Sequence, residues 1–314
     1  PLISTTLPIT AIDAIELFAA ARALGFEAAL WLQPAADRSI VGIGRAWAVE
    51  AAGVDRFAAT TAAWRAVLAD AVGSSPTSDT REVGPTLLGG LGFTGLTPEA
   101  DGRWKSFGPS SLVLPTFAVT RRGPSTNLTV ALAPVRPGDP DPMEVELAWD
   151  ALARDAGERE ASVVGSTTTH GAARFGSNPL QIVDERPGRA GWERTVGLFA
   201  GAVGRGRIDK VVLARRVVFR AAADLDVSAA LRHLARTAPE STTFAFVRGG
   251  TTFLGATPER LVRTAGRSFE TVAIAGSAAR GVDPSEDEHF AAALLASEKD
   301  REEHAVVVDM LRSS

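Results

Sequence analysis

Four consecutive strands without an intervening helix limit the fold of this chain more than any other feature. The sequence predicts a hairpin of residues 242–247 and 251–254, which turns at Arg248-Gly249-Gly250. Two more strands are expected at about 260–264 and 268–275, before a loop from Gly276 to Pro284. Strands that follow one another directly favour an antiparallel or mixed α+β fold over a doubly wound one.

Hydrophobic periodicity and capping residues predict the other elements. Thr10, with Asp13 three residues later as in a capping box, is expected to begin a helix at 11–24, and Gly25 to end it. Further helices are expected at about 54–72, 143–156 and 191–204, and a long one from Ser285, with acidic residues in its first turn. Strands are expected at 26–32, 111–119, 128–132 and 208–219, with an Arg122-Gly123-Pro124 turn after the second.

Composition excludes several classes of function. The chain has 314 residues, a net charge of −4 and no cysteine. A weakly acidic chain disfavours nucleic acid as a partner, and the lack of cysteine excludes thiolate metal sites. The four histidines are not paired at metal-ligand spacing, so Mg²⁺ with oxygen ligands is favoured over zinc. No apolar run approaches the roughly 20 residues that span a bilayer, and no secretory signal is visible, so we expect a cytoplasmic protein without membrane contact.

The run Gly90-Leu91-Gly92-Phe93-Thr94-Gly95 spells a dinucleotide-binding pattern, but its context is wrong. Such a pattern should open a helix whose N-terminus receives the pyrophosphate. Pro98 and Gly102 follow within a few residues, and no helix is expected there. We interpret these glycines as positions that pack a strand against its neighbour.

Lys210 lies in the apolar segment Ile208–Arg215, which is expected to be a strand. On an edge strand this lysine would face water. In a poorly hydrated cleft, desolvation would lower its pKa until it could act as a general base. Strand spacing alone does not decide between these two readings.

Two glutamates stand out for their positions. Glu259 follows Pro258 at a corner between strands, where it could face a cleft or pair with Arg260. Glu303 shares a helical stripe with Ala296, Val306, Val307 and Met310, whereas Glu302 faces the polar side. A carboxylate on a buried stripe needs a partner, either a metal or a cation such as Lys299 one turn earlier. The rest of the Asp-Arg-Glu-Glu-His run is interpreted as a solvated face, and His304 as structural.

Four motifs in order resemble those of the chorismate-utilising enzymes. They are Lys-Val-Val-Leu-Ala-Arg from Lys210, Pro-Glu-Arg-Leu from Pro258, Ala-Gly-Ser from Ala275, and Ser-Glu-Lys-Asp-x-x-Glu-His from Ser297. The resemblance is strong over about 189–314 and looser before. It implies an α+β fold of two facing, mostly antiparallel sheets with outer helices, in one structural domain. Residues 1–188 would be its N-terminal half and 189–314 the first part of the chorismate-binding catalytic core.

The resemblance also implies roles for five residues. Lys210 would be the general base that takes a proton from water, and Glu259 the general acid that protonates the departing hydroxyl. The backbone N–H of Gly276 would help to hold a substrate carboxylate, with Ser277 where a threonine is usual. Glu303 would be one of the carboxylates that hold Mg²⁺.

Within the family, the wording of these motifs resembles the isochorismate synthases, which isomerise chorismate to isochorismate for menaquinone or siderophore synthesis. Anthranilate synthases resemble this chain but carry glutamine at the position of Lys210, and aminodeoxychorismate synthases carry lysine at that of Ala275. No glutaminase subunit is expected if water is the nucleophile. The alternatives are a salicylate synthase, which forms salicylate and pyruvate, and a non-catalytic relic that binds a ligand or a partner.

The family pattern continues beyond Ser314 with a second metal carboxylate, basic contacts to the substrate and a glycine-rich segment. We therefore expect residues 1–314 alone to be truncated, weakly active or inactive, and to expose apolar surface where strands are missing.

Overall fold

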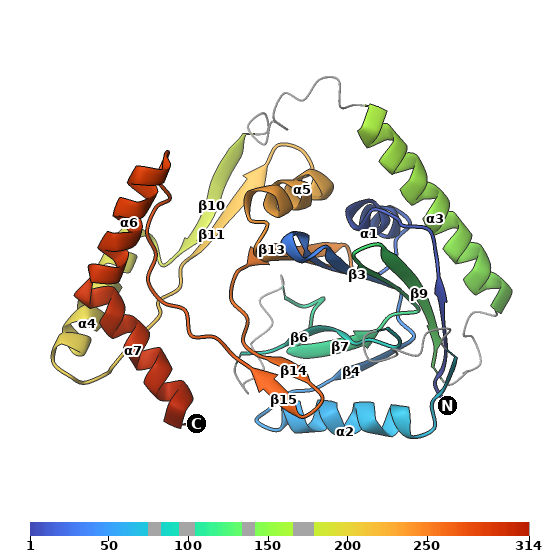
Figure 1. The fold of residues 1–314 in the computed structure, drawn as a ribbon, viewed down its shortest axis with the longest axis horizontal. Helices are drawn as coiled ribbons and strands as arrows, with labels where there is room; N and C mark the ends of the chain where they lie inside the picture. The colour runs from blue at the N-terminus through green and yellow to red at the C-terminus, as the bar shows by residue number, and fades with distance from the viewer. Residues whose placement is uncertain (75–82, 94–103, 134–141, 166–178, 314) are drawn as a thin grey trace. The chain divides into compact units, whose positions relative to one another are not determined.

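The computed structural model describes residues 1–74, 83–93, 104–133, 142–165 and 179–313. It confirms the predicted α+β class, because helices are combined with one large and three small sheets, mostly antiparallel (Figure 1). Contacts group the chain into two compact units, Pro1–Ala173 with Asp226–Pro258, and Arg174–Leu225 with Glu259–Ser314. The boundary between residues 188 and 189 that the resemblance implies does not coincide with this grouping and stays a prediction.

An eight-stranded sheet forms the centre of the first unit, in the order β13-β12-β2-β3-β8-β9-β1-β5. Neighbouring strands are antiparallel except β1 and β5, which are parallel. Its strands are β1 (Ile3–Pro8), β2 (Ala28–Gln33), β3 (Arg38–Ile43), β5 (Val72–Ser74), β8 (Phe117–Arg122), β9 (Ser125–Leu132), β12 (Thr242–Arg248) and β13 (Thr251–Thr257). The predicted β12–β13 hairpin is confirmed, with Gly249 and Gly250 at φ +51° and +73° in the turn.

Helices cover one face of this sheet and close the main core. They are α1 (Ala14–Ala23), α3 (Pro142–Gly165) and α5 (Val227–Thr237), with α1 in contact with both other helices (Figure 1). Phe18 and Leu17 of α1 are fully buried beside Leu30 and Leu231. The predicted cap was wrong: Asp13 rather than Thr10 caps α1, because its Oδ1 accepts from the backbone N–H groups of Ile15 and Glu16 at 2.9 and 3.0 Å.

A three-stranded antiparallel sheet, β4 (Trp47–Glu50), β7 (Ser110–Leu114) and β6 (Leu88–Leu91), lies on the other side of the large sheet (Figure 1). Helix α2 (Arg56–Ala69) contacts β4. The predicted strand 111–119 is divided at Pro115, which follows β7 as the chain passes from the small sheet into β8. The interpretation of the glycine-rich run as packing is confirmed at Gly92, where a Cβ would lie 2.4 Å from the carbonyl oxygen of Pro109, but it is wrong at Gly90, where no atom lies within 4 Å. Thr94 and Gly95 lie outside the described residues.

The second unit contains short sheets and three helices. Strands β10 (Leu180–Arg186) and β11 (Arg216–Ala221) pair with each other, as do β14 (Arg263–Ala265) and β15 (Ser268–Glu270). The helices are α4 (Arg189–Gly204), α6 (Pro284–Ala296) and α7 (Glu298–Ser313). None of the helices in the described part of the chain has the length and apolar character to cross a membrane.

The strands predicted at 260–264 and 268–275 are shorter than expected, since β14 begins at Arg263 and β15 ends at Glu270. Two other sequence predictions in this unit were wrong. The strand expected at 208–219 begins only at Arg216, so Lys210 lies in an irregular segment, and residues 208–215 pair with no strand that the structure describes. The long helix expected from Ser285 is two helices, because Ser297 leaves the helical conformation at φ −64°, ψ 112°. Its Oγ accepts from the N–H of Asp300 at 3.3 Å and so caps α7.

Candidate active site

Lys210 and Glu303, predicted separately from distant segments, lie together in the second unit. The Nζ of Lys210 is 3.2 Å from Oε1 of Glu303, with 28% and 40% of the two side chains exposed. Lys210 therefore does not face water as the edge-strand reading required. Because the pair is only partly exposed, it is screened less than a pair on the open surface.

Glu303 lies in α7, but the buried stripe predicted around it is mostly wrong: Val306 and Met310 are 38% and 58% exposed, and the exposed Ala296 lies in α6. Glu303 is half-buried while Glu302 is exposed, as the 100° spacing predicts. The partner is Lys210 rather than Lys299, whose Nζ lies 3.9 Å from Asp300 and whose side chain is 86% exposed. The cation that satisfies Glu303 thus comes from another segment of the unit.

Gly276 forms a close contact between the predicted Ala-Gly-Ser turn and α7. Its φ of +84° lies in the left-handed region, which glycine adopts without steric cost. A Cβ at this position would lie 3.1 Å from the Cβ of Asp300. The backbone of the turn is therefore held directly against the helix that carries Glu303. Ser277 is exposed in the same loop.

Glu259 is exposed and directly follows β13 and Pro258, at the first position of the second of the two segments that form the second unit. The neighbouring Arg260 donates to Glu270 at 2.5 Å. The role of Glu259 as a general acid opposite Lys210 stays a prediction.

Asp300 is the residue that the sequence reasoning missed, since it was assigned to a solvated face. Only 23% of its side chain is exposed, less than for Glu303. Residues three apart in a helix share a face, so Asp300 and Glu303 are neighbours on α7. The Nε2 of His304 lies 3.3 Å from the carbonyl oxygen of Ala273, and the structural role of this histidine stays a prediction. The three-residue spacing between Asp300 and Glu303 was the sequence signal that could have identified Asp300.

The fit of these residues to Mg²⁺ is partial. Within the described residues, no group of three or more histidine or acidic side chains could hold a metal ion. Asp300 and Glu303 do provide two carboxylates on one helical face. Mg²⁺ is commonly bound by one or two carboxylates, with water and substrate oxygens as its other ligands. The described residues could thus contribute part of a magnesium site.

Comparisons with known proteins place the whole chain rather than its individual site residues. Over 317 aligned residues the chain is 32% identical to a salicylate biosynthesis isochorismate synthase of Pseudomonas aeruginosa, with 100% of this chain and 61% of the relative covered. It is 31% identical to the isochorismate synthase EntC of Escherichia coli K12, over 61% of this chain and 47% of EntC. The chain thus spans at most about three fifths of these relatives.

The fold is also that of a solved relative. The structure of MenF, the menaquinone-specific isochorismate synthase of Escherichia coli, matches with a TM-score of 0.65 at 21% identity, over 98% of this chain and 62% of MenF. A family model described as chorismate binding enzyme matches residues 1–314. Since that match spans the whole sequence, the chain belongs to the chorismate-binding enzyme family.

Proposed function

We propose that the protein is an isochorismate synthase, which converts chorismate to isochorismate with Mg²⁺ as cofactor. The main support is the pairing of Lys210 with Glu303 at 3.2 Å in a chain whose relatives are named isochorismate synthases. A lysine and an acidic helical face in one place are the groups that this isomerisation needs: a proton acceptor and a holder for a cation. Lys210 is also the residue that separates this chain from the anthranilate synthases it resembles.

Lys210 would take a proton from the water that attacks the ring, and Glu259 would give a proton to the hydroxyl that leaves. One water is added and one is released, so the product is an isomer of the substrate. The ammonium of Lys210 contacts Glu303 in the structure. To act as the base, Lys210 would present the lone pair of its amine to the attacking water.

The turn at Gly276 and Ser277 would receive a substrate carboxylate through the backbone N–H of Gly276, and it lies against the helix that carries Glu303. Glu303, with Asp300 beside it, would contribute oxygen ligands to Mg²⁺. The metal would supply positive charge for the carboxylates of the substrate.

The test is to incubate the product of the complete reading frame with chorismate and Mg²⁺ and to separate the products chromatographically. We expect isochorismate as the product, with activity lost on chelation and restored by Mg²⁺. Lys210→Ala should lower kcat by about 10² to 10⁴-fold, the range for a general base. Lys105→Ala, at an exposed lysine of the first unit, is the control and should leave turnover unchanged.

Other products would overturn the proposal in defined ways. Salicylate with pyruvate would identify a salicylate synthase, and anthranilate formed with ammonia would show that Lys210 was misinterpreted. An absence of turnover would favour a protein that only binds its ligand. Equal turnover by Lys210→Ala and the unmodified protein would exclude this lysine as the base.

A further inference from the structure

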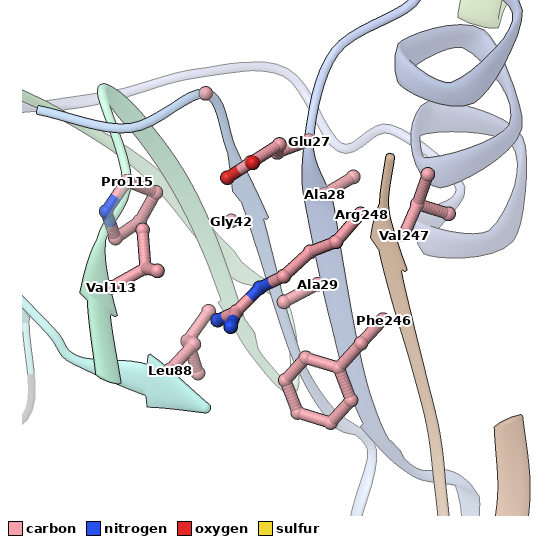
Figure 2. A pocket seen from close by; sticks show the side chains of 11 residues that line it. Glu27, Ala28, Ala29, Gly42, Leu88, Val113, Pro115, Phe246, Val247 and Arg248 are labelled. Atoms are coloured by element: carbon pink, nitrogen blue, oxygen red, sulfur yellow. The ribbon is translucent and has the colours of Figure 1, made fainter. Parts of the chain in front are cut away.

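Arg248, the last residue of β12, extends into a hollow between the two sheets of the first unit. Only 7% of this residue is exposed, and Figure 2 shows its guanidinium among Leu88, Ala29 and Phe246. The hollow is small and partly open to solvent. Its walls are Glu27, Ala28, Ala29, Gly42, Gly44, Leu88, Val113, Pro115, Phe246, Val247 and Arg248.

Arg248 is a buried cation without a direct partner. Within the part of the chain that the structure describes, its guanidinium makes no hydrogen bond and no ion pair. A guanidinium stays charged in proteins and has five N–H donors to satisfy. The nitrogens of Arg248 are not among the fully enclosed atoms without a partner, so solvent reaches them, and an anion that replaces this water would gain a favourable contact with the charge.

The nearby acids do not supply this balance directly. Glu27 lines the hollow, but both of its oxygens accept from Arg45, at 2.9 and 3.1 Å. Glu50 is exposed. Burial lowers the pKa of Arg248; the charges of Glu27 and Glu50 oppose this shift, while that of Arg45 adds to it. The acids therefore act only at a distance, and the donors of Arg248 stay available.

We propose that this hollow binds the carboxylate group of a small organic acid, with the guanidinium of Arg248 as its anchor. A planar guanidinium matches a carboxylate through two parallel hydrogen bonds. The apolar side chains of Leu88, Val113 and Phe246 would contact the carbon skeleton of the ligand. The charge of Glu27 disfavours a doubly charged phosphate, and so a monocarboxylate fits better.

Gly42 lets Leu88 and Pro115 pack closely at one wall of the hollow. A Cβ at Gly42 would lie 2.6 Å from Cδ1 of Leu88 and 3.0 Å from Cγ of Pro115. Only a glycine therefore lets the sheets come this close without a shift of these side chains. The ligand has room for only a few carbon atoms beside its carboxylate.

The probes for this site are propionate and its neutral isostere propionamide, with binding followed by saturation-transfer NMR. We expect saturable binding of propionate and none of propionamide. Arg248→Met should weaken propionate binding by more than about tenfold, because truncating one partner of a buried charged pair removes most of its attraction. Arg121→Met is the matched control and should not change it, since Arg121 pairs with Asp37 outside the hollow.

Two further variants keep the test decisive if Arg248→Met folds poorly. Arg248→Lys keeps the charge but loses the planar guanidinium that can donate two parallel hydrogen bonds, and it should weaken propionate binding by several fold. Arg45→Met should also weaken it, because Glu27 is released to compete for Arg248. The circular dichroism spectrum of each variant checks its fold.

Three results would each overturn the proposal. One is that the protein binds propionate and propionamide equally well, or that it binds neither. Another is tighter binding of inorganic phosphate than of propionate. The last is binding that survives Arg248→Met but is lost in Lys210→Ala, which would place the ligand in the candidate active site instead.

Discussion

The first unit has a packed core, whereas the second has none among its described residues. Phe18, Leu17 and Leu30 are fully buried in the first unit, where even the charged Glu16 is 4% exposed and pairs with Arg232. No described residue of the second unit is buried. Its large apolar side chains, such as Leu198, Phe219 and Leu295, are 68%, 52% and 76% exposed.

The difference concerns what holds each unit together. Burial of large side chains contributes roughly 1.5 to 3 kcal/mol each, whereas an exposed ion pair contributes about 0 to 1 kcal/mol. The second unit depends on pairs of the latter kind, such as Arg260 with Glu270 and Arg280 with Asp287. The candidate active-site residues therefore lie in the unit with the weaker internal packing, while the proposed carboxylate site lies in the well-packed one.

The largest effect is expected from the core of the first unit. Phe18→Ala should lower the free energy of unfolding by about 3 to 5 kcal/mol, because it leaves a cavity among fully buried side chains. Phe219→Ala, which removes the same atoms from a residue 52% exposed in the second unit, should cost less than about 1 kcal/mol. Denaturant titrations followed by circular dichroism measure both. Equal losses would show that the two units do not differ in packing.

Glycine-to-alanine substitutions test the same comparison between the two units, with a smaller expected change in the free energy of unfolding. Gly92→Ala should cost about 1 to 3 kcal/mol, because the new Cβ would lie 2.4 Å from the carbonyl oxygen of Pro109. No atom lies within 4 Å of the corresponding position at Gly90, which is the control on the same segment. In the second unit Gly197 is equally open within α4, and Gly197→Ala should stabilise by about 0.5 to 1 kcal/mol. A cost at Gly90 or Gly197 as large as at Gly92 would contradict this picture.

Elements with a strong local signal were predictable from the sequence. The β12–β13 hairpin combines alternating burial with two glycines in its turn, so its position and pairing follow from neighbouring residues. The segment 208–215 has the same apolar character, but strands also need a partner, and the local sequence does not show one. Residues from Arg216 on find that partner in β10.

The candidate site shows the same division between local and long-range information. Helical spacing distinguishes the half-buried Glu303 from the exposed Glu302, although most of the apolar stripe around Glu303 is exposed, and its need for a cation follows from charge. The identity of that cation did not follow, because Lys210 reaches Glu303 from a distant irregular segment. Helix capping was a local signal that was overlooked twice, at Asp13 and at Ser297.

The smallest effect is expected at the N-terminus of α6, where an exposed pair orders the loop before the helix. Both oxygens of Asp287 accept from Arg280, at 2.6 and 2.7 Å, and Oδ1 also accepts from the N–H of Gly281. The hydrogen bond from Arg280 holds the pKa of Asp287 below its ordinary value, and the Gly281 N–H adds to this. A lowered pKa in the folded protein means that this carboxylate stabilises the fold fully above its unfolded pKa of about 3.9 and loses that contribution as the pH falls through the folded value.

Arg280→Gln should therefore raise the pKa of Asp287 towards normal in an NMR titration of its carboxyl carbon, whereas Arg267→Gln, at another exposed arginine of this unit, should not. Stability should change little in either variant, because the side chain of Arg280 is 88% exposed and solvent screens the pair. A large loss of stability in Arg280→Gln would mean that exposed ion pairs hold the second unit together more strongly than its surface position allows.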